Sequence, residues 1–267
     1  MPVRVVELFV YPIKSARGIA VPSAALERRG FALDRRWMLV DEKGSFLTQR
    51  ALPRMALLEV SIGEDHLAVR APAMGEIAVP LASDGAVERR TRVTVWDDTC
   101  DAILAPDDVS CWFTQALGVP CRLVHMPDDS LRQADPDFST PQDLVGFADG
   151  FPLLLTSVSS LEDLNARLER PVPMNRFRPN VVVSGGAPFE EDVWTRVEAC
   201  GVTFRVAKPC ARCAITTVDQ QTAETGKEPL RTLATFRAAN GGVMFGQNLL
   251  HDCLGTLRVG AEVAVLV

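Results

Sequence analysis

The chain has 267 residues, of which 47% are hydrophobic and 23% are charged, and its formal net charge is −6. This length is enough for one large or two small domains with their own hydrophobic cores. The acidic balance disfavours a general nucleic-acid binder, and no stretch approaches the roughly 20 apolar residues that a membrane-spanning helix needs. We therefore expect neither nucleic acid nor a membrane among the partners.

The N-terminal segment MPVRVVELFVYPIKS has no long apolar region and no small-residue cleavage site, so we expect no secretory signal. Seven cysteines are an odd number for a chain of this length. They predict reduced thiols rather than a disulfide framework, and the cytoplasm as the compartment. The seven are Cys100, Cys111, Cys121, Cys200, Cys210, Cys213 and Cys253.

The first part of the chain predicts short β-strands. Residues 3–15 are apolar and β-branched, residues 35–50 form two short strands around a DEKG turn, and residues 57–72 repeat this pattern around GED. Residues 91–103 predict one further strand. Strands this short and this closely spaced indicate a barrel or a sandwich.

A helix and a polar junction follow. DDVSCWFTQALG predicts a helix with Asp108 as N-cap and Gly118 as its stop, and CRLVHM predicts a strand. Residues 127–143 are polar and rich in proline, which favours a loop at a domain boundary. We therefore divide the chain into residues 1–126 and 127–267.

The second part mixes strands with short helices, and the predicted class is α+β, predominantly β. A helix with a serine N-cap and leucines at helical spacing is expected in residues 157–170, and a short one in 229–239. FGQNLL is a polar insertion next to an apolar segment, and the alternative interpretation is a tight turn that requires Gly246. Strands are expected in residues 151–157, 178–186, 201–209 and 257–267.

Basic side chains and one hydroxyl gather at three strand ends or turns. Guanidinium, ammonium and turn N–H groups together suit phosphate oxygens, so these residues predict a local positive pocket for an anionic cofactor. The alternative is that they are solvated surface charges. The residues are Lys14 and Ser15, Arg35 and Arg36, and Arg176 and Arg178.

The tripeptide Arg178-Pro179-Asn180 is more specific. Proline disfavours the helical region for the residue before it, which predicts an extended Arg178. Asn180 then enters the apolar run NVVVSGG, where a buried amide needs hydrogen-bond partners.

The segment KPCARCAITTVD places Cys210 and Cys213 three residues apart. A structural zinc site needs four ligands, usually from two such pairs or from one pair plus histidines. This chain has one Cys-x-x-Cys, and its three histidines are isolated, so structural zinc is disfavoured.

A thioredoxin-like redox pair is also disfavoured, because it opens a helix whereas AITTVD is β-branched and predicts an extended segment. Two readings of Cys210 and Cys213 stay open. One is a single thiolate ligand to a soft transition metal, favoured by nearby Arg212 and Lys208, and the other is a pair of structural cysteines.

Four segments, in this order, resemble the molybdenum cofactor sulfurase C-terminal (MOSC) domain proteins. The similarity is to the branch of amidoxime reducing components and their bacterial relatives, which carry an N-terminal β-barrel domain, and it spans essentially the whole chain. The most specific element is the Cys-x-x-Cys segment. The segments are YPIKSARGI, LDRRWMLVD, NRFRPNVVVSGG and KPCARCAITTVDQQTAETGKEPLRTL.

The resemblance implies a β-barrel MOSC core with an N-terminal β-rich domain, and a molybdenum cofactor (Mo-molybdopterin) held between the two lobes. It implies that Cys213 is the catalytic residue and the protein ligand to the metal, with Cys210 as a neighbour. It further implies cofactor contacts by Lys14, Ser15, Arg35, Arg178, Asn180 and Asp149.

The resemblance also implies an oxidoreductase that reduces small N-oxygenated substrates of the amidoxime or hydroxylamine type. Bacterial relatives often append a ferredoxin-like domain, which we expect to be missing here, so the electron donor would be external, of the ferredoxin, flavodoxin or cytochrome b5 type. The alternatives are a cofactor carrier or sulfur-handling protein without substrate turnover, and a plain binding module. For Asp149 and Asp219 we favour turn capping over proton handling.

Overall fold

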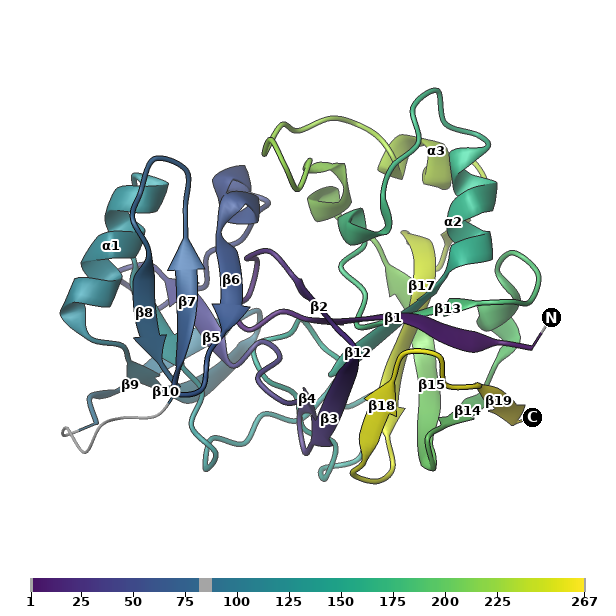
Figure 1. Cartoon of the computed structure of the whole chain (residues 1–267), viewed down its shortest axis with the longest axis horizontal. Helices are drawn as coiled ribbons and strands as arrows, with labels where there is room; N and C mark the ends of the chain where they lie inside the picture. The colour runs from purple at the N-terminus through teal and green to yellow at the C-terminus, as the bar shows by residue number, and fades with distance from the viewer. Residues whose placement is uncertain (1, 82–87, 267) are drawn as a thin grey trace.

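The computed structural model describes residues 2–81 and 88–266, and it confirms a predominantly β protein. Figure 1 shows two lobes side by side, with both termini at the far end of the second lobe. Within the described residues, no helix combines the length and the hydropathy that crossing a membrane requires.

The second lobe is built on a nine-stranded sheet in the order β19-β14-β15-β17-β12-β13-β1-β2, with β16 paired to β17. Strand β1 is antiparallel to β13, so the first residues of the chain complete the sheet of its second half. Strand pairing thus crosses the boundary predicted after residue 126, and that boundary stays a prediction. The strands are Arg4–Val10 (β1), Ile19–Val21 (β2), Leu153–Ser157 (β12), Val181–Ser184 (β13), Arg196–Ala199 (β14), Val202–Ala211 (β15), Ala238–Ala239 (β16), Gly242–His251 (β17) and Ala264–Leu266 (β19).

Three smaller sheets complete the β-structure. The order β5-β11-β10-β9 and the order β6-β7-β8 form the first lobe, and β18-β3-β4 lies between the lobes (Figure 1). Their strands are Ser23–Glu27 (β3), Gly30–Phe31 (β4), Trp37–Val40 (β5), Glu59–Ile62 (β6), His66–Arg70 (β7), Ile77–Pro80 (β8), Arg90–Val95 (β9), Asp98–Leu104 (β10), Arg122–His125 (β11) and Thr256–Arg258 (β18).

The helices are few and short. Gly118 ends the first helix in the left-handed conformation, as predicted, but Pro106 occupies the N-cap position and Asp108 lies inside the first turn. Ser157 is at the N-cap of the second helix, although its side chain makes no capping hydrogen bond. The α-helices are Asp107–Leu117 (α1), Val158–Asn165 (α2) and Leu230–Ala234 (α3), and the 3-10 helices are Pro53–Leu57 (η1), Met174–Arg176 (η2), Glu190–Val193 (η3) and Ala214–Thr217 (η4).

Several sequence predictions of strands and turns differ from the structure. Residues 91–103 form a hairpin, β9 and β10, because Trp96 and Asp97 make its turn. The segment FGQNLL makes no tight turn but lies within the long strand β17, where Gly246 has a φ of +77° at an irregularity in the pairing with β15. The expected closing strand is split into β18 and β19, which join different sheets.

Each lobe has its own hydrophobic core. In the first lobe, Val109, Phe113 and Leu117 share one face of α1, because they recur every four residues, and they pack against the sheet around Trp37. In the second lobe, α2 and α3 cover one face of the large sheet, where the rings of Phe177 and Phe245 stack 4.0 Å apart. The two cores hold the strand ends between the lobes in fixed positions.

His125 packs against Trp37 in the first lobe, with the ring centroids 4.7 Å apart. The pKa of His125 is lowered from 6.5 to about 4, chiefly by burial and also by the charge of Arg36, while Asp128 opposes the shift. The unfolded chain therefore binds more protons than the folded chain between pH 6.5 and 4, so stability falls as the pH drops through this window. We expect a loss of up to about 3 kcal/mol in the free energy of unfolding.

His125→Phe keeps a ring against Trp37 and cannot titrate. Urea unfolding at several pH values between 7 and 4 should show a flatter dependence for this variant than for the parent. Parallel curves for the two proteins would mean that His125 does not cause the acid sensitivity.

Candidate functional site

The turn after β1 buries Lys14 between the lobes. The Lys14 backbone N–H donates to the carbonyl of Trp37 at 2.8 Å, which ties the turn to the first lobe. The ammonium group donates to the carbonyl of Phe147 at 2.7 Å and to Asp149 Oδ1 at 2.5 Å. Burial lowers the pKa of Lys14, and the Asp149 carboxylate opposes this shift. Lys14 is thus a buried cation with one carboxylate partner.

Arg35 and Asn180 meet at a second point, around the buried Asp34. Arg35 Nη1 donates to Asp34 Oδ2 at 2.6 Å and to Asn180 Oδ1 at 2.9 Å. Asn180 Nδ2 donates to Asp34 Oδ1 at 3.1 Å and to the carbonyl of Phe9 at 3.2 Å, and Asn180 Oδ1 also accepts from the backbone of Leu154. The predicted requirement of Asn180 for partners is therefore met, and it links two strands of the sheet to Arg35.

Tyr11 and Arg178 connect the Lys14 turn with the cluster of Arg35, Asp34 and Asn180. The guanidinium carbons of Arg35 and Arg178 lie 4.1 and 4.4 Å from the centroid of the Tyr11 ring. Arg178 Nη1 donates to the carbonyl of Ala16 at 2.7 Å, next to Lys14 and Ser15 in the chain. Arg178 is buried, and burial lowers its pKa to about 10, so it stays charged at neutral pH. Arg178 therefore reaches from the turn after β1 to the Arg35 group.

Four non-glycine residues of this region have left-handed backbones. The φ angles are 67° at Ser15, 47° at Arg35, 56° at Trp96 and 54° at Arg178. The extended conformation predicted for Arg178 was therefore wrong, because the hydrogen bonds on both sides of Pro179 override the local preference. Such backbone strain persists where surrounding structure imposes it, and it concentrates at functional sites.

Cys213 lies at the end of the segment that follows β15, directly before η4. The sequence predicted an extended AITTVD, but residues 214–217 form a 3-10 turn. The Thr216 hydroxyl donates to the carbonyl of Cys213 at 3.0 Å and the Thr217 hydroxyl to that of Ala214 at 2.8 Å, which compensates for the low helical preference of threonine. Cys213 Sγ accepts a hydrogen bond from Arg50 Nε at 3.3 Å.

The two cysteines of the Cys-x-x-Cys segment contact different partners. Arg212 Nη1 donates to Cys210 Sγ at 2.9 Å, whereas Lys208 pairs with Asp135 at 2.5 Å. The basic neighbours predicted to favour a Cys213 thiolate therefore act elsewhere, and both sulfurs are free thiols. The segment is thus a pair of separate single-cysteine environments.

Asp149 connects Cys213 to Lys14. Its carboxylate accepts from Arg50 Nη2 at 3.3 Å and from Trp96 Nε1 at 3.1 Å, in addition to Lys14. Burial works to raise the pKa of Asp149, but the charges of Lys14 and Arg50 hold it below its usual range. Turn capping was therefore the wrong interpretation for Asp149, which is an ion-pair partner. It is right for Asp219, which accepts from the backbones of Gln221 and Thr222.

The structure brings Lys14, Asp149 and Cys213 into one hydrogen-bonded chain, and Arg35, Asn180 and Arg178 into a second group that reaches it. Arg36 and Arg176 belong to neither group. Sequence reasoning missed Arg50, Trp96, Asp34 and Tyr11. Tyr11 and Asp34 lie in YPIKSARGI and LDRRWMLVD, two of the segments that resemble the family. No sequence motif around Arg50 or Trp96 indicates a site.

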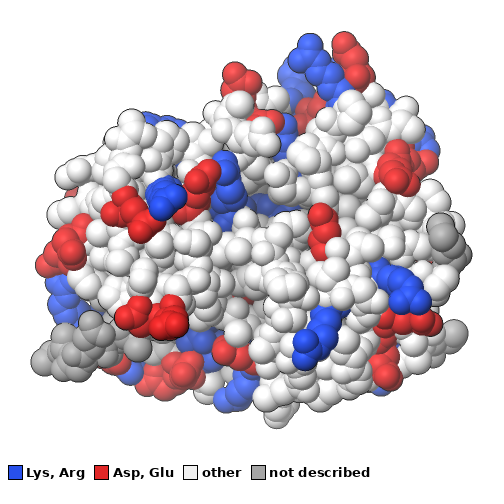
Figure 2. Space-filling view, viewed as in Figure 1, with Lys and Arg blue, Asp and Glu red and all other residues white. Residues whose placement is uncertain are grey.

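The charge of the region suits an anion. Lys and Arg atoms line a hollow between the two lobes in the space-filling view (Figure 2). Four cations of the two groups are accompanied by only two carboxylates. The cations are Lys14, Arg35, Arg50 and Arg178, and the carboxylates are Asp34 and Asp149.

A bare metal ion does not fit this environment. In the described part of the chain, no group of three or more His, Cys, Asp or Glu side chains could hold a metal. Cys213 supplies one soft sulfur ligand, and the cations around it would repel an unaccompanied cation. A metal that arrives with its own anionic chelate fits both features.

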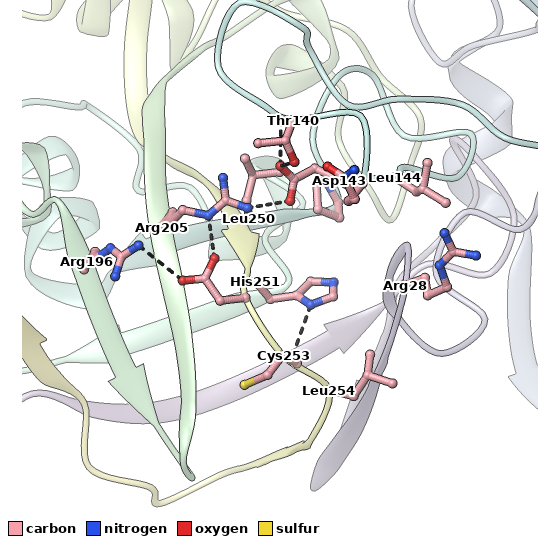
Figure 3. Close-up of a pocket in the computed structure, with 13 residues that line it drawn as sticks. Arg28, Thr140, Asp143, Leu144, Arg196, Arg205, Leu250, His251, Cys253 and Leu254 are labelled. Carbon is pink, nitrogen blue, oxygen red and sulfur yellow. Dashed lines mark hydrogen bonds and ion pairs between the residues drawn. The ribbon is translucent and has the colours of Figure 1, made fainter.

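One cavity of about 460 Å³ lies away from Cys213, beside β15 and β17 (Figure 3). Arg205 reaches Asp252 at 2.6 Å and also pairs with Asp143, while Arg196 lies 3.4 Å from Asp252. These arginines and aspartates form ion pairs with one another, which indicates that they stabilise the packing of the strands rather than bind a ligand.

Replacing Asn180 with alanine should lower the free energy of unfolding by about 3 kcal/mol, since the buried partners of its amide would lose their hydrogen bonds. Asn248→Ala is the matched control, because this half-buried amide makes one 3.4 Å bond to the carbonyl of Lys208. Urea unfolding of both variants tests this, and equal losses would contradict a special role for Asn180.

Fold and site together define a β-rich, two-lobed protein with a buried cationic region beside a single cysteine sulfur. The sequence matches the MOSC N-terminal beta barrel domain over residues 2–120 and the MOSC domain over residues 142–264. The chain belongs to the family of MOSC-domain proteins, which confirms the predicted resemblance.

Named relatives narrow the range of functions. The chain is 34% identical to mitochondrial amidoxime-reducing component 1 of Mus musculus, over 98% of the chain and 82% of the relative. It is 30% identical to the molybdenum cofactor sulfurase of Oryza sativa subsp. japonica, over 92% of the chain and 32% of the relative. Among solved structures, the YUAD protein of Bacillus subtilis aligns over 98% of the chain and 94% of its own, with a TM-score of 0.47 and 10% identity. The named relatives support a function related to the molybdenum cofactor.

Proposed function

We propose that this protein binds the molybdenum cofactor and uses it to reduce small N-oxygenated substrates of the amidoxime or hydroxylamine type. The observation that carries the proposal is the single sulfur of Cys213, joined through Arg50 and Asp149 to the buried cation Lys14. The similarity to amidoxime-reducing components supports the choice of substrate.

The residues present fit such a cofactor. Lys14, Arg35 and Arg178 would hold its phosphate and the polar edge of its pterin, with Ser15 and Asn180 completing the contacts and Asp149 fixing Lys14. Cys213 would give the metal its protein ligand. When bound, the cofactor supplies the two-electron redox chemistry of the reaction.

The protein's own part is to bind, to orient and to keep charges in place. Because its pKa lies below the usual range, Asp149 stays ionised at neutral pH and serves as a fixed counter-charge rather than as a proton donor. Arg50 is held by its stacking on Trp96, with its guanidinium carbon 4.6 Å from the ring centroid. This contact directs its Nε–H to the Cys213 sulfur.

The proposed partner is an external electron-transfer protein of the ferredoxin, flavodoxin or cytochrome b5 type, and the proposed compartment is the cytoplasm. All seven cysteines are free thiols, which supports a reducing environment. We propose no nucleic-acid and no membrane partner.

A second candidate is a carrier or sulfur-handling protein that holds the same cofactor without substrate turnover. The similarity to the molybdenum cofactor sulfurase favours this candidate. It would use the same binding residues, so the two functions differ in turnover rather than in the site.

Protein produced in a host that makes the cofactor separates these functions. Metal and pterin analysis should find stoichiometric molybdenum, and reduced methyl viologen should drive reduction of an aromatic amidoxime. Stoichiometric molybdenum without reduction would favour the carrier. Protein with neither metal nor pterin from such a host would overturn the proposal.

A further inference from the structure

A larger cavity, of about 1120 Å³, lies between the first lobe and the β18-β3-β4 sheet and is lined by neither Cys213 nor Lys14. Strands β3, β8, β10 and β11 border it, together with the β4–β5 connection. Much of its wall is apolar, including Leu26, Leu33, Val79, Ile103 and Leu104.

Two buried arginines stand in this apolar wall. The side chains of Arg29 and Arg36 are only 7% and 9% exposed. Arg29 Nη2 donates to the carbonyls of Asp128 and Ser130, and Arg36 Nη2 donates to the carbonyl of Met126 and to Asp128 Oδ1. These bonds hold the segment after β11 against the first lobe.

The other terminal nitrogen of each guanidinium group, Nη1, does not donate to this segment. Arg29 Nη1 lies 4.0 Å from Asp128 Oδ1, and Arg36 Nη1 lies 3.6 Å from Glu27 Oε2, both too long for a hydrogen bond. Among the described residues, neither Nη1 has a hydrogen-bond acceptor, and Arg29 Nε is buried without a partner. The two carboxylates are 90% and 50% exposed, so solvent weakens their hold on the cations.

His125 adds a flat, uncharged surface to the same cavity. Its ring packs on Trp37, and its lowered pKa keeps it neutral at physiological pH. The cavity thus combines hydrocarbon and aromatic surface with four arginines and three carboxylates, and the Nη1 groups of Arg29 and Arg36 make no hydrogen bond to a described residue.

We propose that this cavity binds a small organic acid with an apolar body. Its carboxylate would accept hydrogen bonds from Nη1 of Arg29 and Arg36, and its hydrocarbon part would lie against Ile103, Leu104 and His125. Charge-assisted bonds to buried guanidinium groups are strong and directional, and an apolar pocket with few polar groups is typical of small-molecule sites. This site is independent of the molybdenum cofactor.

Isothermal titration of the full chain with octanoate tests the proposal, with octanamide as the uncharged match. We expect octanoate to bind at least about tenfold more tightly than octanamide, because the amide lacks the charge that the two arginines recognise. Equal affinities, or no octanoate binding at all, would overturn the proposal.

Two variants locate the binding. Arg36→Gln removes one guanidinium, and Ile103→Trp fills the cavity while leaving both arginines in place. Each should weaken octanoate binding about tenfold or more, whereas Arg70→Gln, at an exposed arginine on β7 paired with Glu76, should not change it. If Arg36→Gln fails to fold, Ile103→Trp still decides, since unchanged affinity in that variant contradicts binding in this cavity.

Discussion

Replacing Cys213 with serine should abolish molybdenum binding and the reduction of N-oxygenated substrates. A serine hydroxyl is a poor ligand for a soft metal, and in the part of the chain that the structure describes, Cys213 is the cysteine whose sulfur contacts Arg50. The fold should persist, because Cys213 is only half-buried and the described contact of its sulfur is one 3.3 Å hydrogen bond from Arg50. The free energy of unfolding should therefore change by no more than about 1 kcal/mol.

Cys210→Ser is the matched control for this experiment. The sulfur of Cys210 accepts from Arg212 rather than from Arg50, so this variant should keep its molybdenum and most of its activity. Metal content, pterin content and viologen-driven activity are measured for both variants. Undiminished activity in Cys213→Ser would end its role as metal ligand, and equal losses in the two variants would mean that both sulfurs are needed.

The basic pattern in the sequence named more residues than converge, because Arg36 and Arg176 lie in neither group, and it did not show how the others are held. Lys14, Arg35 and Arg178 stood in segments whose order and spacing resemble one family, and the structure brings them together around Tyr11 and the turn after β1. Arg50 has no such local pattern, because its contact with Cys213 spans 163 positions of the chain. Their role in cofactor binding stays a prediction that the variants test.

Local sequence preference did not predict the backbone conformation at two places where hydrogen bonds of the side chains determine it. Residues 214–217 are β-branched for the most part, yet threonine hydroxyls bonded to nearby carbonyls close them into a 3-10 turn. Arg178 precedes a proline, yet it adopts a positive φ because its guanidinium is bound on the far side of the site. Apolar strands such as β1 and β12 were predicted correctly, since both are paired on two sides and β12 is buried along its whole length.

Replacing Gly246 with alanine should lower the free energy of unfolding by about 3 kcal/mol or more. Gly246 lies in the middle of β17 with a φ of +77°, and an added Cβ would lie 2.6 Å from the carbonyl oxygen of Leu155 on the neighbouring strand β12. Relief of this clash requires β12 to move away. Such a movement would disturb the pairing of Leu154 with Asn248 and the two hydrogen bonds between Leu154 and Asn180, one donated by each backbone N–H.

Gly241→Ala separates the clash from the backbone strain. Gly241 has nearly the same φ, +75°, but an added Cβ there would meet nothing within 4 Å. This variant should therefore lose only about 1 kcal/mol, the cost of a left-handed backbone for alanine. Urea unfolding of the two variants gives the difference directly. If both variants lose the same free energy of unfolding, β12 moves aside for the new methyl group at little cost. The close approach of β17 to β12 would then not require glycine at position 246.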